Sequence, residues 1–379
     1  MKNLLFLLGR YPGYGGIECV TTHLANYLCQ YDKFRVFIFS FSSQCENDLL
    51  PLLNKKVGYF CSGDNDFLSK KNEKLLTDFL TFQKIDLVIN QDSYANTYKT
   101  FIKAQKRIDQ KIDFIEVEHN VPDYINKSFS AFGKKGFINF LRKIKGCYLN
   151  SLRHRELYSI CKKYVLLSSG FIDAYKSVTH QLNVSKLVSI PNPVTVLRPS
   201  EIPAEKENVC LFCGRLNSQK GLFFLLDIWA KVYRKFPNWK LQIVGDGELK
   251  NSLIDYIEKN EILLVEFCGF HVDMTPFYQK AKIFCMTSIF EGWGLTITEA
   301  MTYGCVPLQF GSYAAVTDVI DDNRNGFIVK PFDVEDYVHK LELLMSNNSL
   351  CESFAENSFE KAKLFDINTI GEKWLNIIS

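Results

Sequence analysis

The sequence predicts an α/β protein with two doubly wound domains, each a parallel sheet with helices on both faces. Short apolar runs typical of buried strands alternate along the 379 residues with longer amphipathic stretches typical of helices. The alternation occurs twice, on either side of residues 197–208, where two prolines and several charges are typical of a linker. In each half the first strand leads into a glycine-containing loop and then a helix, and open α/β sheets bind ligands at such strand ends.

Composition indicates a globular protein. A chain of 379 residues has room for two or three domains, and a hydrophobic content of 47% is ample for two cores. The net charge of +3 is too small to indicate nucleic-acid binding. No apolar run approaches the roughly 18 residues that cross a bilayer, and Leu4–Leu8 is too short for the core of a signal peptide. The twelve cysteines are scattered singly, which fits thiols in a reducing cytoplasm.

The sequence offers no pattern for a metal or a cofactor, and we expect neither. Cys210 and Cys213 form a C-x-x-C, but on a predicted strand residues three apart face opposite sides. The six histidines show no metal-ligand spacing. Asp64 and Asp66 form a D-x-D motif, which we interpret as a polar turn before a helix.

In the first half, the elements are predicted from periodicity. Strands are expected at residues 4–8, 35–41, 87–90, 114–117, 164–167 and 187–190, and helices at 17–31, 70–82, 95–107 and after Ser168. The first loop contains Gly15 and Gly16, and glycine lets a backbone approach a ligand closely. Its glycines do not form G-x-G-x-x-G, so a nicotinamide-binding fingerprint is not supported. A merely flexible turn is the alternative.

One histidine stands at a strand end. The strand at 114–117 runs into Glu118-His119-Asn120, which places His119 at the carboxyl end of a strand, where ligands bind. A lone histidine is more often structural than catalytic, so both roles remain open for His119.

The second half repeats the pattern. Strands are expected at residues 209–212, 241–244, 265–268 and 281–286, and helices at 222–234, 333–346, 367–378 and after the turn at 245–247. The loop GRLNSQKG carries Arg215 and Lys220 just before a helix, where cations and a helix N-terminus can hold an anion. The G-K-[ST] of a Walker loop is missing.

Two glutamates flank the loop that follows the strand at 281–286. In FEGWGLTITEAMTYG, Glu291 and Glu299 are eight residues apart, and Gly292 and Gly294 lie between them. Thr296 and Glu299 have the S/T-x-x-E form of a capping box, which predicts a helix start. Glu299 could therefore be only a cap, and Gly294 only a turn former. A capping box does not need Glu291, which points to a ligand site.

These motifs resemble those of a known family. E-G-W-G-L-T-I-T-E-A-M is similar to the E-x7-E signature of retaining, nucleotide-sugar-dependent glycosyltransferases of family 4, which have the GT-B fold. GGIECVTTHLANYL, H-N-x-P, IPNPV and GRLNSQKG are similar to further stretches of that family, so the resemblance spans nearly the whole chain. Thr296 stands where the family often has Pro or Ser.

The resemblance implies two Rossmann-like domains that face each other across a cleft. Residues 1–195 would form the acceptor domain, residues 196–364 the nucleotide-sugar donor domain, and residues 365–379 a helix that crosses back to the first domain. The implied reaction is transfer of a hexose-type sugar from a UDP- or GDP-sugar to a hydroxyl, with retention of configuration and without a metal.

The resemblance also assigns roles. Arg215 and Lys220 would hold the diphosphate, Glu291 the donor-sugar hydroxyls, Glu299 the ribose, and His119 would lie beside the donor sugar. The implied catalytic residues are Glu291, His119, Arg215 and Lys220, and the implied donor-binding residues are Gly15, Gly16, Arg215, Lys220, Gly269, Phe270, Glu291, Gly294, Leu295, Thr296 and Glu299.

Residues 121–170 form a basic segment. They hold ten positive and two negative residues, a net charge of +8 that leaves −5 for the rest of the chain. Apolar residues interleave with these charges, namely Phe132, Phe137, Ile138, Phe140, Leu141 and Ile144. One interpretation is a peripheral contact with anionic membrane, which would bring a cytoplasmic protein to the inner face of that membrane. The other is a basic helix that packs its apolar side on the core.

Two alternatives for the function remain open. A catalytically silent nucleotide-sugar-binding subunit would have the same fold, although intact Glu291, Arg215 and Lys220 argue against it. A nucleotide-sugar epimerase would also share the fold, but the acid and base pattern that its chemistry needs is not seen. The expected partners are a nucleotide-sugar donor and a lipid-linked or cell-surface glycan acceptor. The donor sugar, its base and the linkage formed cannot be read from these residues.

Overall fold

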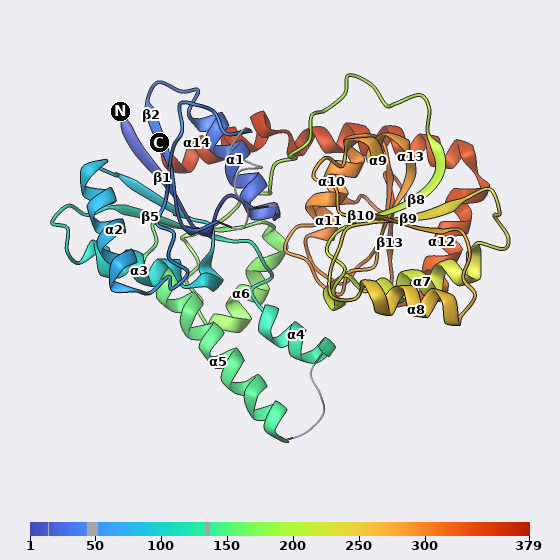
Figure 1. Ribbon diagram of the computed structural model, residues 1–379, viewed down its shortest axis with the longest axis horizontal. Coiled ribbons are helices and arrows are strands. Elements are labelled where there is room, and N and C mark those ends of the chain that lie inside the picture. The colour runs from blue at the N-terminus through green and yellow to red at the C-terminus, as the bar shows by residue number, and fades with distance from the viewer. Residues whose placement is uncertain (14, 44–51, 133–136) are drawn as a thin grey trace. The chain divides into compact units, whose positions relative to one another are not determined.

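The computed structural model describes residues 1–13, 15–43, 52–132 and 137–379 (Figure 1). Within these residues the chain forms two compact units. The first consists of Met1–Ile125, Phe140–Thr195 and Ile367–Ser379, and the second of Asn126–Asn139 and Val196–Asp366. The sequence predicts boundaries after residues 195 and 364, and it does not predict that Asn126–Asn139 groups with the second unit. Lys127 contributes to that grouping, because its Nζ donates to the carbonyl oxygen of Ser312 at 3.4 Å.

The first unit contains a parallel sheet with the doubly wound order. Its strands, in sheet order, are β3 (Gly58–Cys61), β2 (Phe34–Ser42), β1 (Lys2–Arg10), β4 (Leu87–Asn90), β5 (Asp113–Glu118), β6 (Lys163–Leu166) and β7 (Leu187–Ser189). Leu4 of the central strand is in register with Val36 on one side and Leu87 on the other. Strands β2 and β3 are added on one side of β1, and β4 to β7 on the other. The strand order therefore reverses between β1 and β4, and ligands bind at this switch point in folds of this type.

Helices cover both faces of the first sheet (Figure 1). They are α1 (Gly16–Leu28), α2 (Lys70–Phe82), α3 (Thr97–Gln105), α5 (Phe137–Ile160), α6 (Ile172–Thr179) and α14 (Ile367–Ile378). The short helix α4 (Tyr124–Phe132) precedes α5, and most of it falls in Asn126–Asn139, which groups with the second unit. The short 3₁₀ helices of the first unit are η2 (Ser93–Ala95) and η3 (Ser169–Phe171). The predicted turn before α2 is confirmed, since Ser69 caps the helix and its Oγ donates to Asp64 Oδ2 at 2.7 Å.

The second unit contains another parallel sheet. Its strands, in sheet order, are β10 (Val265–Gly269), β9 (Lys240–Val244), β8 (Glu207–Cys213), β11 (Ala281–Met286), β12 (Val306–Phe310) and β13 (Phe327–Val329). Its helices are η4 (Ser218–Lys220), α7 (Leu222–Val232), α8 (Lys250–Lys259), α9 (Thr275–Lys280), α10 (Leu295–Met301), α11 (Val316–Val319), α12 (Val334–Ser346), α13 (Asn348–Ala362) and η5 (Lys363–Phe365). Figure 1 shows α7 and α8 on one side of this sheet and α9 and α13 on the other. The predicted fold class, two doubly wound α/β domains, is confirmed.

The core of the second unit is built around α7. Trp229 is fully buried between the helix and the sheet, and its indole Nε1 donates to the carbonyl oxygen of Leu263 at 3.0 Å. Both faces of β11 are covered, as a central parallel strand requires, so Ile283 and Phe284 are fully buried although they point in opposite directions. Burial on both faces explains why residues 283–286 of this strand are all apolar.

The C-terminal helix α14 belongs to the first unit, where it packs on α1. A Cβ on Gly371 would lie 2.2 Å from the ring of Tyr27, so only glycine allows this approach. The hydroxyl of Tyr27 donates to Glu372 Oε1 at 3.2 Å, and Lys2 Nζ donates to the carbonyl oxygen of Ile378 at 2.5 Å. The end of the chain is therefore tied to its beginning.

Two further features bear on function. Among the described residues, no helix is both long and apolar enough to span a membrane. Within the same residues, no group of three or more histidine, cysteine or acidic side chains is arranged to hold a metal ion. Cys210 and Cys213 are both buried in β8.

Candidate functional site

The centre of the site in the second unit is an ion pair. Lys220 Nζ lies 2.7 Å from Glu291 Oε1, and the two side chains are only 16% and 10% exposed. Lys220 ends η4 in the loop after β8, and Glu291 lies in the loop after β11. These two strands are adjacent and parallel, so their carboxyl ends bring the loops together at one edge of the sheet.

Hydrogen bonds join the two loops. The hydroxyl of Thr287 donates to the carbonyl oxygens of Lys220 and Gly221 at 3.1 and 3.0 Å. From the other side, Gln219 Nε2 donates to the carbonyl oxygen of Phe290 at 3.0 Å. The separation of Lys220 and Glu291 is thus fixed by backbone contacts as well as by their charges.

Arg215 lies in the same loop as Lys220. Arg215 is exposed, whereas the neighbouring Leu216 is fully buried and anchors the loop to the core. The backbone N–H of Leu216 donates to the carbonyl oxygen of Asp246 at 2.9 Å, so the loop is also tied to the end of β9. The arrangement leaves the guanidinium of Arg215 accessible to an anion.

Glu299 is buried beside a tyrosine, and the predicted capping box is wrong. The first residue of α10 is Leu295 and its N-cap is Gly294, whose φ of 86° lies in the left-handed region that favours glycine. Thr296 therefore sits inside the first turn and cannot act as the N-cap. Glu299 is 8% exposed, and its Oε2 accepts a hydrogen bond from the Tyr278 hydroxyl at 2.9 Å. Burial raises the pKa of Tyr278 well above its usual range, so the phenol stays a donor.

Gly269 and Phe270 are at the end of β10. Gly269 is the last residue of the strand, and its carbonyl oxygen accepts from the N–H of Gly245 at 2.7 Å. Phe270 follows with 51% of its surface exposed. An exposed aromatic ring at the carboxyl end of a strand offers a surface on which a planar base can stack.

His119 lies in the first unit and stays uncharged at neutral pH. His119 is half-buried, and burial lowers the pKa of its imidazole to about 4. His119 Nε2 is 2.5 Å from Gln91 Oε1, and Gln91 follows β4, the strand next to β5. A neutral ring that donates from Nε2 to this oxygen keeps Nδ1 as an acceptor.

Gly15 and Gly16 begin α1 in the first unit. Gly15 is the N-cap, and its carbonyl oxygen accepts from the N–H of Cys19 at 3.1 Å. Gly16 is the first helical residue. They follow β1 directly in a unit whose switch point also lies beside β1.

A buried polar network in the first unit was not predicted from the sequence. Glu116 and Glu118 are fully buried on one face of β5. Arg153 of α5 donates to Glu118 Oε2 at 3.2 Å, and Asn90 donates to Glu116 Oε2 at 2.8 Å. Burial raises the pKa of both carboxyl groups, that of Glu116 most strongly. The signal in the sequence is two glutamates at i and i+2 in an otherwise apolar strand.

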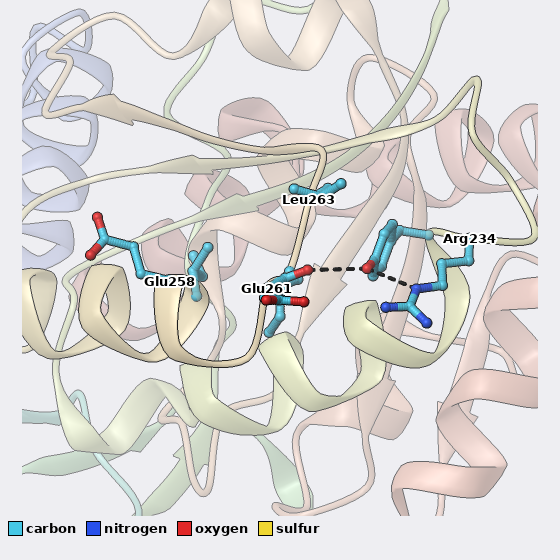
Figure 2. Close-up of a pocket in the computed structure, with 7 residues that line it drawn as sticks. Arg234, Glu258, Glu261 and Leu263 are labelled. Carbon is cyan, nitrogen blue, oxygen red and sulfur yellow. Dashed lines mark hydrogen bonds between the residues drawn. The ribbon is translucent and has the colours of Figure 1, made fainter.

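A surface pocket lies elsewhere in the second unit (Figure 2). It is lined by Tyr233, Arg234, Ile257, Glu258, Glu261, Ile262 and Leu263. The Tyr233 hydroxyl accepts from Arg234 Nε at 3.0 Å and donates to the carbonyl oxygen of Glu261 at 3.1 Å. Tyr233 and Arg234 follow α7, Ile257 and Glu258 belong to the last turn of α8, and Glu261, Ile262 and Leu263 follow that helix. The next strands are β9 and β10, so the pocket is at the amino edge of the sheet. The ion pair is at the opposite, carboxyl edge.

The fold and the loops at the strand ends indicate which class of protein this chain resembles. Two parallel α/β sheets with interleaved helices are the architecture of GT-B glycosyltransferases. The crystal structure of Anabaena Alr3699/HepE in complex with UDP-glucose aligns with a TM-score of 0.77, 17% identity and coverage of 99% of each chain. At that identity the likeness establishes the fold.

The sequence comparisons point to a glycosyltransferase family. Residues 193–361 match the family described as Glycosyl transferases group 1. An uncharacterized glycosyltransferase of Haemophilus influenzae is 26% identical over 384 residues and covers 100% of both chains. A Campylobacter jejuni enzyme, GalNAc-alpha-(1->4)-GalNAc-alpha-(1->3)-diNAcBac-PP-undecaprenol alpha-1,4-N-acetyl-D-galactosaminyltransferase, is 31% identical over 176 residues, 46% of this chain and 49% of that enzyme. These comparisons support a group 1 glycosyltransferase, and the loops that carry the ion pair lie within the matched residues.

Proposed function

We propose that this protein transfers a sugar from a nucleoside diphosphate sugar to a hydroxyl of a lipid-linked or cell-surface glycan, with retention of configuration and without a metal ion. The observation that carries the proposal is the ion pair between Lys220 and Glu291 at the carboxyl edge of the second sheet. It combines a cation for a diphosphate with a carboxylate for sugar hydroxyls in one small site.

Lys220 and Arg215 stabilise the leaving diphosphate. Negative charge builds up on the diphosphate as the bond to the sugar stretches, and preorganised cations stabilise that charge. Lys220 is fixed by the joined loops, whereas Arg215 is exposed and offers a planar guanidinium that grips two phosphate oxygens. Two protein cations can thereby supply the role that a divalent metal has in other transferases.

Glu291 and Glu299 bind the two sugars of the donor. Glu291 accepts hydrogen bonds from hydroxyls of the transferred hexose once Lys220 turns to the phosphate. Glu299 accepts from the ribose hydroxyls while Tyr278 holds its other oxygen. The segment with Gly294, Leu295 and Thr296 lies between the two glutamates in the chain, and Gly269 and Phe270 adjoin the base.

The first unit supplies the acceptor side. Neutral His119 offers Nδ1 to a hydroxyl of the donor sugar or the acceptor, and Gly15 and Gly16 let the backbone approach a phosphate closely. The name of the Campylobacter relative specifies an undecaprenol-linked glycan, which supports a lipid-linked acceptor. The HepE complex contains UDP-glucose, which makes UDP-sugars the first donors to test and GDP-sugars the second.

Helix α5 brings the enzyme to anionic membrane. Its apolar side chains at Ile138, Leu141, Ile144, Tyr148 and Leu152 recur every three or four residues and are 40–67% exposed. The alternative, a helix that packs its apolar side on the core, is therefore wrong for Ile138, Phe140, Leu141 and Ile144.

The charge of the helix selects the lipid. Arg142, Lys143 and Lys145 lie among these apolar residues, and residues 124–155 contain no acidic side chain. A basic helix with an exposed apolar stripe suits the interface of an anionic bilayer. Lys134 and Lys135, which the basic segment also includes, lie outside the described residues, as do the side chains of Phe132 and Phe137.

A donor screen followed by a transfer assay tests the proposal. A UDP- or GDP-sugar that binds should stabilise the folded protein by ~2.7 kcal/mol in a thermal-shift assay when its concentration is about 100 times its Kd. The same donor should then be consumed by wild-type protein with a lipid-linked glycan, in the presence or absence of EDTA. Binding without transfer would favour the silent subunit, and interconversion of the donor without an acceptor would favour the epimerase. Loss of transfer in EDTA that a divalent metal restores would overturn metal independence.

A further inference from the structure

Buried polar atoms without a partner gather at the carboxyl ends of β11 and β12. Among the described residues, such atoms occur in the side chains of Ser288, Trp293, Thr296, Gln309 and Tyr313. Ser288, Trp293 and Thr296 belong to the segment that carries Glu291, whereas Gln309 and Tyr313 come from the end of β12. Most buried polar atoms in folded proteins are paired, so a cluster of this kind calls for an explanation.

Tyr313 lies directly under the turn at Gly294. A Cβ on Gly294 would be 2.9 Å from the hydroxyl oxygen of Tyr313 and 3.0 Å from the Ile297 side chain. Tyr313 is 4% exposed, so the phenol is a fixed part of the packing. The hydroxyl thus occupies the space that a side chain at position 294 would need, three residues beyond Glu291.

Tyr313 remains a hydrogen-bond donor near a carboxylate. Burial raises the pKa of the phenol far above its usual range, and the negative charge of Glu291 raises it further, while Gln309 opposes the shift. A neutral phenol has one proton to donate, and within the described part of the chain no acceptor meets the distance and angle of a hydrogen bond from it. Gln309 is fully buried on β12, where Met286 of β11 is its register partner.

The proposed function sets a requirement that this tyrosine meets. When Lys220 turns from Glu291 to the donor diphosphate, Glu291 loses its partner at 2.7 Å. The hexose hydroxyls replace part of that interaction, and an ionised carboxylate has about four acceptor sites, so a further donor from the protein can stabilise the charge in a site this buried.

We propose that Tyr313 is a positioning residue for the Glu291 loop. Its hydroxyl, backed by Gln309, supports the Gly294 turn in the free protein and donates to the Glu291 carboxylate when Lys220 binds phosphate. The second half of this statement rests on the proposed function, whereas the contact under Gly294 does not.

A double-mutant cycle tests the contact without any substrate. Gly294→Ala should lower the melting temperature more in the wild-type background than in the Tyr313→Phe background, because the Phe variant lacks the oxygen that the new methyl group meets. Equal effects in both backgrounds would show that the hydroxyl does not support the turn and would overturn the inference. Thermal melts of the four proteins are sufficient for this measurement.

Kinetics test the consequence for Glu291. Tyr313→Phe should lower the kcat of transfer about 10- to 100-fold, the range for a hydrogen bond to a charged group, and leave the Kd for UDP or GDP unchanged. Tyr303→Phe is the matched control, because this buried tyrosine of the same unit donates instead to the carbonyl oxygen of Leu197 at 2.6 Å. Normal transfer by Tyr313→Phe would overturn the positioning role. The melting temperatures could show coupling between positions 294 and 313 while the wild-type protein transfers no sugar. That result would contradict the proposed function but would still support the contact between Tyr313 and the Gly294 turn.

Discussion

Lys220 and Glu291 neutralise each other across 2.7 Å at the carboxyl edge of the second sheet. Both are more than four-fifths buried, and each comes from a different loop. The donor that we propose, with two phosphates and a hexose, would offer each side chain a new partner, so that its binding would replace one ion pair with several polar contacts. The free site is preorganised and already electrically balanced, which lowers the cost of keeping both charges away from water.

Replacing Lys220 tests its place at the leaving group. Lys220→Ala should lower kcat by about 10²–10³, the usual cost of removing one preorganised group that stabilises transition-state charge, with a smaller change in the donor KM. Steady-state transfer rates over a range of donor concentrations provide the measurement. Lys231→Ala is the control, since Lys231 forms an exposed ion pair with Glu335 in the same unit. A near-normal kcat for Lys220→Ala would show that this lysine does not act on the leaving group.

Arg215 gives a second, geometric test. Arg215→Lys keeps the charge but loses the planar pair of donors, so phosphate oxygens would be held by a point charge. We expect kcat/KM to fall by at least about tenfold, with the melting temperature unchanged because the side chain is exposed. Arg234→Lys, at the opposite edge of the same sheet, should behave like the wild type. If Arg215→Lys retains full kcat/KM, a two-pronged contact with phosphate is excluded.

Elements with a strong pattern could be predicted almost to the residue. The helix at 70–82, the strand at 281–286 and the helix at 367–378 have the predicted ends. They are continuous apolar runs or amphipathic stretches with clear boundaries. The strands β12 (Val306–Phe310) and β13 (Phe327–Val329) were not predicted, because short runs that include proline or glycine neighbours carry little periodic signal.

The site was predictable only where it lies in a motif. Lys220 and Glu291 could be singled out from their loops, yet only the order of β8 and β11 in the sheet brings them together. Tyr313 could not be found from a local pattern, because its importance comes from packing between segments distant in sequence. The capping box failed for a related reason, since the left-handed backbone at Gly294 starts the helix earlier than the side chains suggest.

The proposed ribose contact of Glu299 can be tested by comparing the affinity for the free nucleoside diphosphate with the affinity for the full donor. The Oε2 of Glu299 is held by Tyr278, so a ribose contact by this carboxylate predicts that Glu299→Gln weakens the free nucleoside diphosphate as much as the full donor. Isothermal titration with UDP and with the UDP-sugar measures both affinities. Tyr278→Phe should weaken them in the same direction by less, because the carboxylate remains. A lower melting temperature for Glu299→Gln with unchanged nucleotide affinity would leave Glu299 a purely structural role.

His119 should make the protein less stable in mild acid. Its pKa is lowered from 6.5 to about 4 in the folded state, so between these pH values the unfolded chain binds more protons. The free energy of unfolding should therefore fall as the pH drops from 6.5 towards 4. Urea titrations of wild type and His119→Gln should show a shallower decline in the variant. The raised pKa values of Glu116 and Glu118 act in the opposite direction, but they are common to both proteins and cancel in the comparison. Identical pH profiles would mean that His119 is not desolvated.

The proposed membrane contact of α5 has a charge part and an apolar part that can be tested separately. Near an anionic surface each Lys or Arg contributes about 1 kcal/mol, so replacing Arg142, Lys143 and Lys145 with Gln should weaken binding to phosphatidylserine vesicles roughly 100-fold. Replacing the exposed Ile144 and Tyr148 with Ser should also weaken it, and this loss should persist at high salt, where electrostatic attraction is screened.

The matched control lies on another helix of the same unit. Lys70, Lys71 and Lys74 are three exposed lysines of α2, and replacing them with Gln removes the same charge without touching α5. Vesicle sedimentation should be nearly unchanged for this control if the contact is specific to α5, since charges beyond a Debye length of about 8 Å from the surface contribute little at physiological salt. The outcome that would contradict the membrane contact is a wild type that does not bind vesicles but forms a concentration-dependent dimer, which Ile144→Ser and Tyr148→Ser dissociate. The apolar stripe would then bind a second copy of the chain.

The membrane contact should also affect the rate of transfer, because α5 is anchored through Arg153 to the carboxylate of Glu118, next to His119. The vesicle-bound enzyme should transfer sugar to a lipid-linked acceptor faster than the charge-depleted variant does. On a soluble acceptor the two proteins should have the same rate.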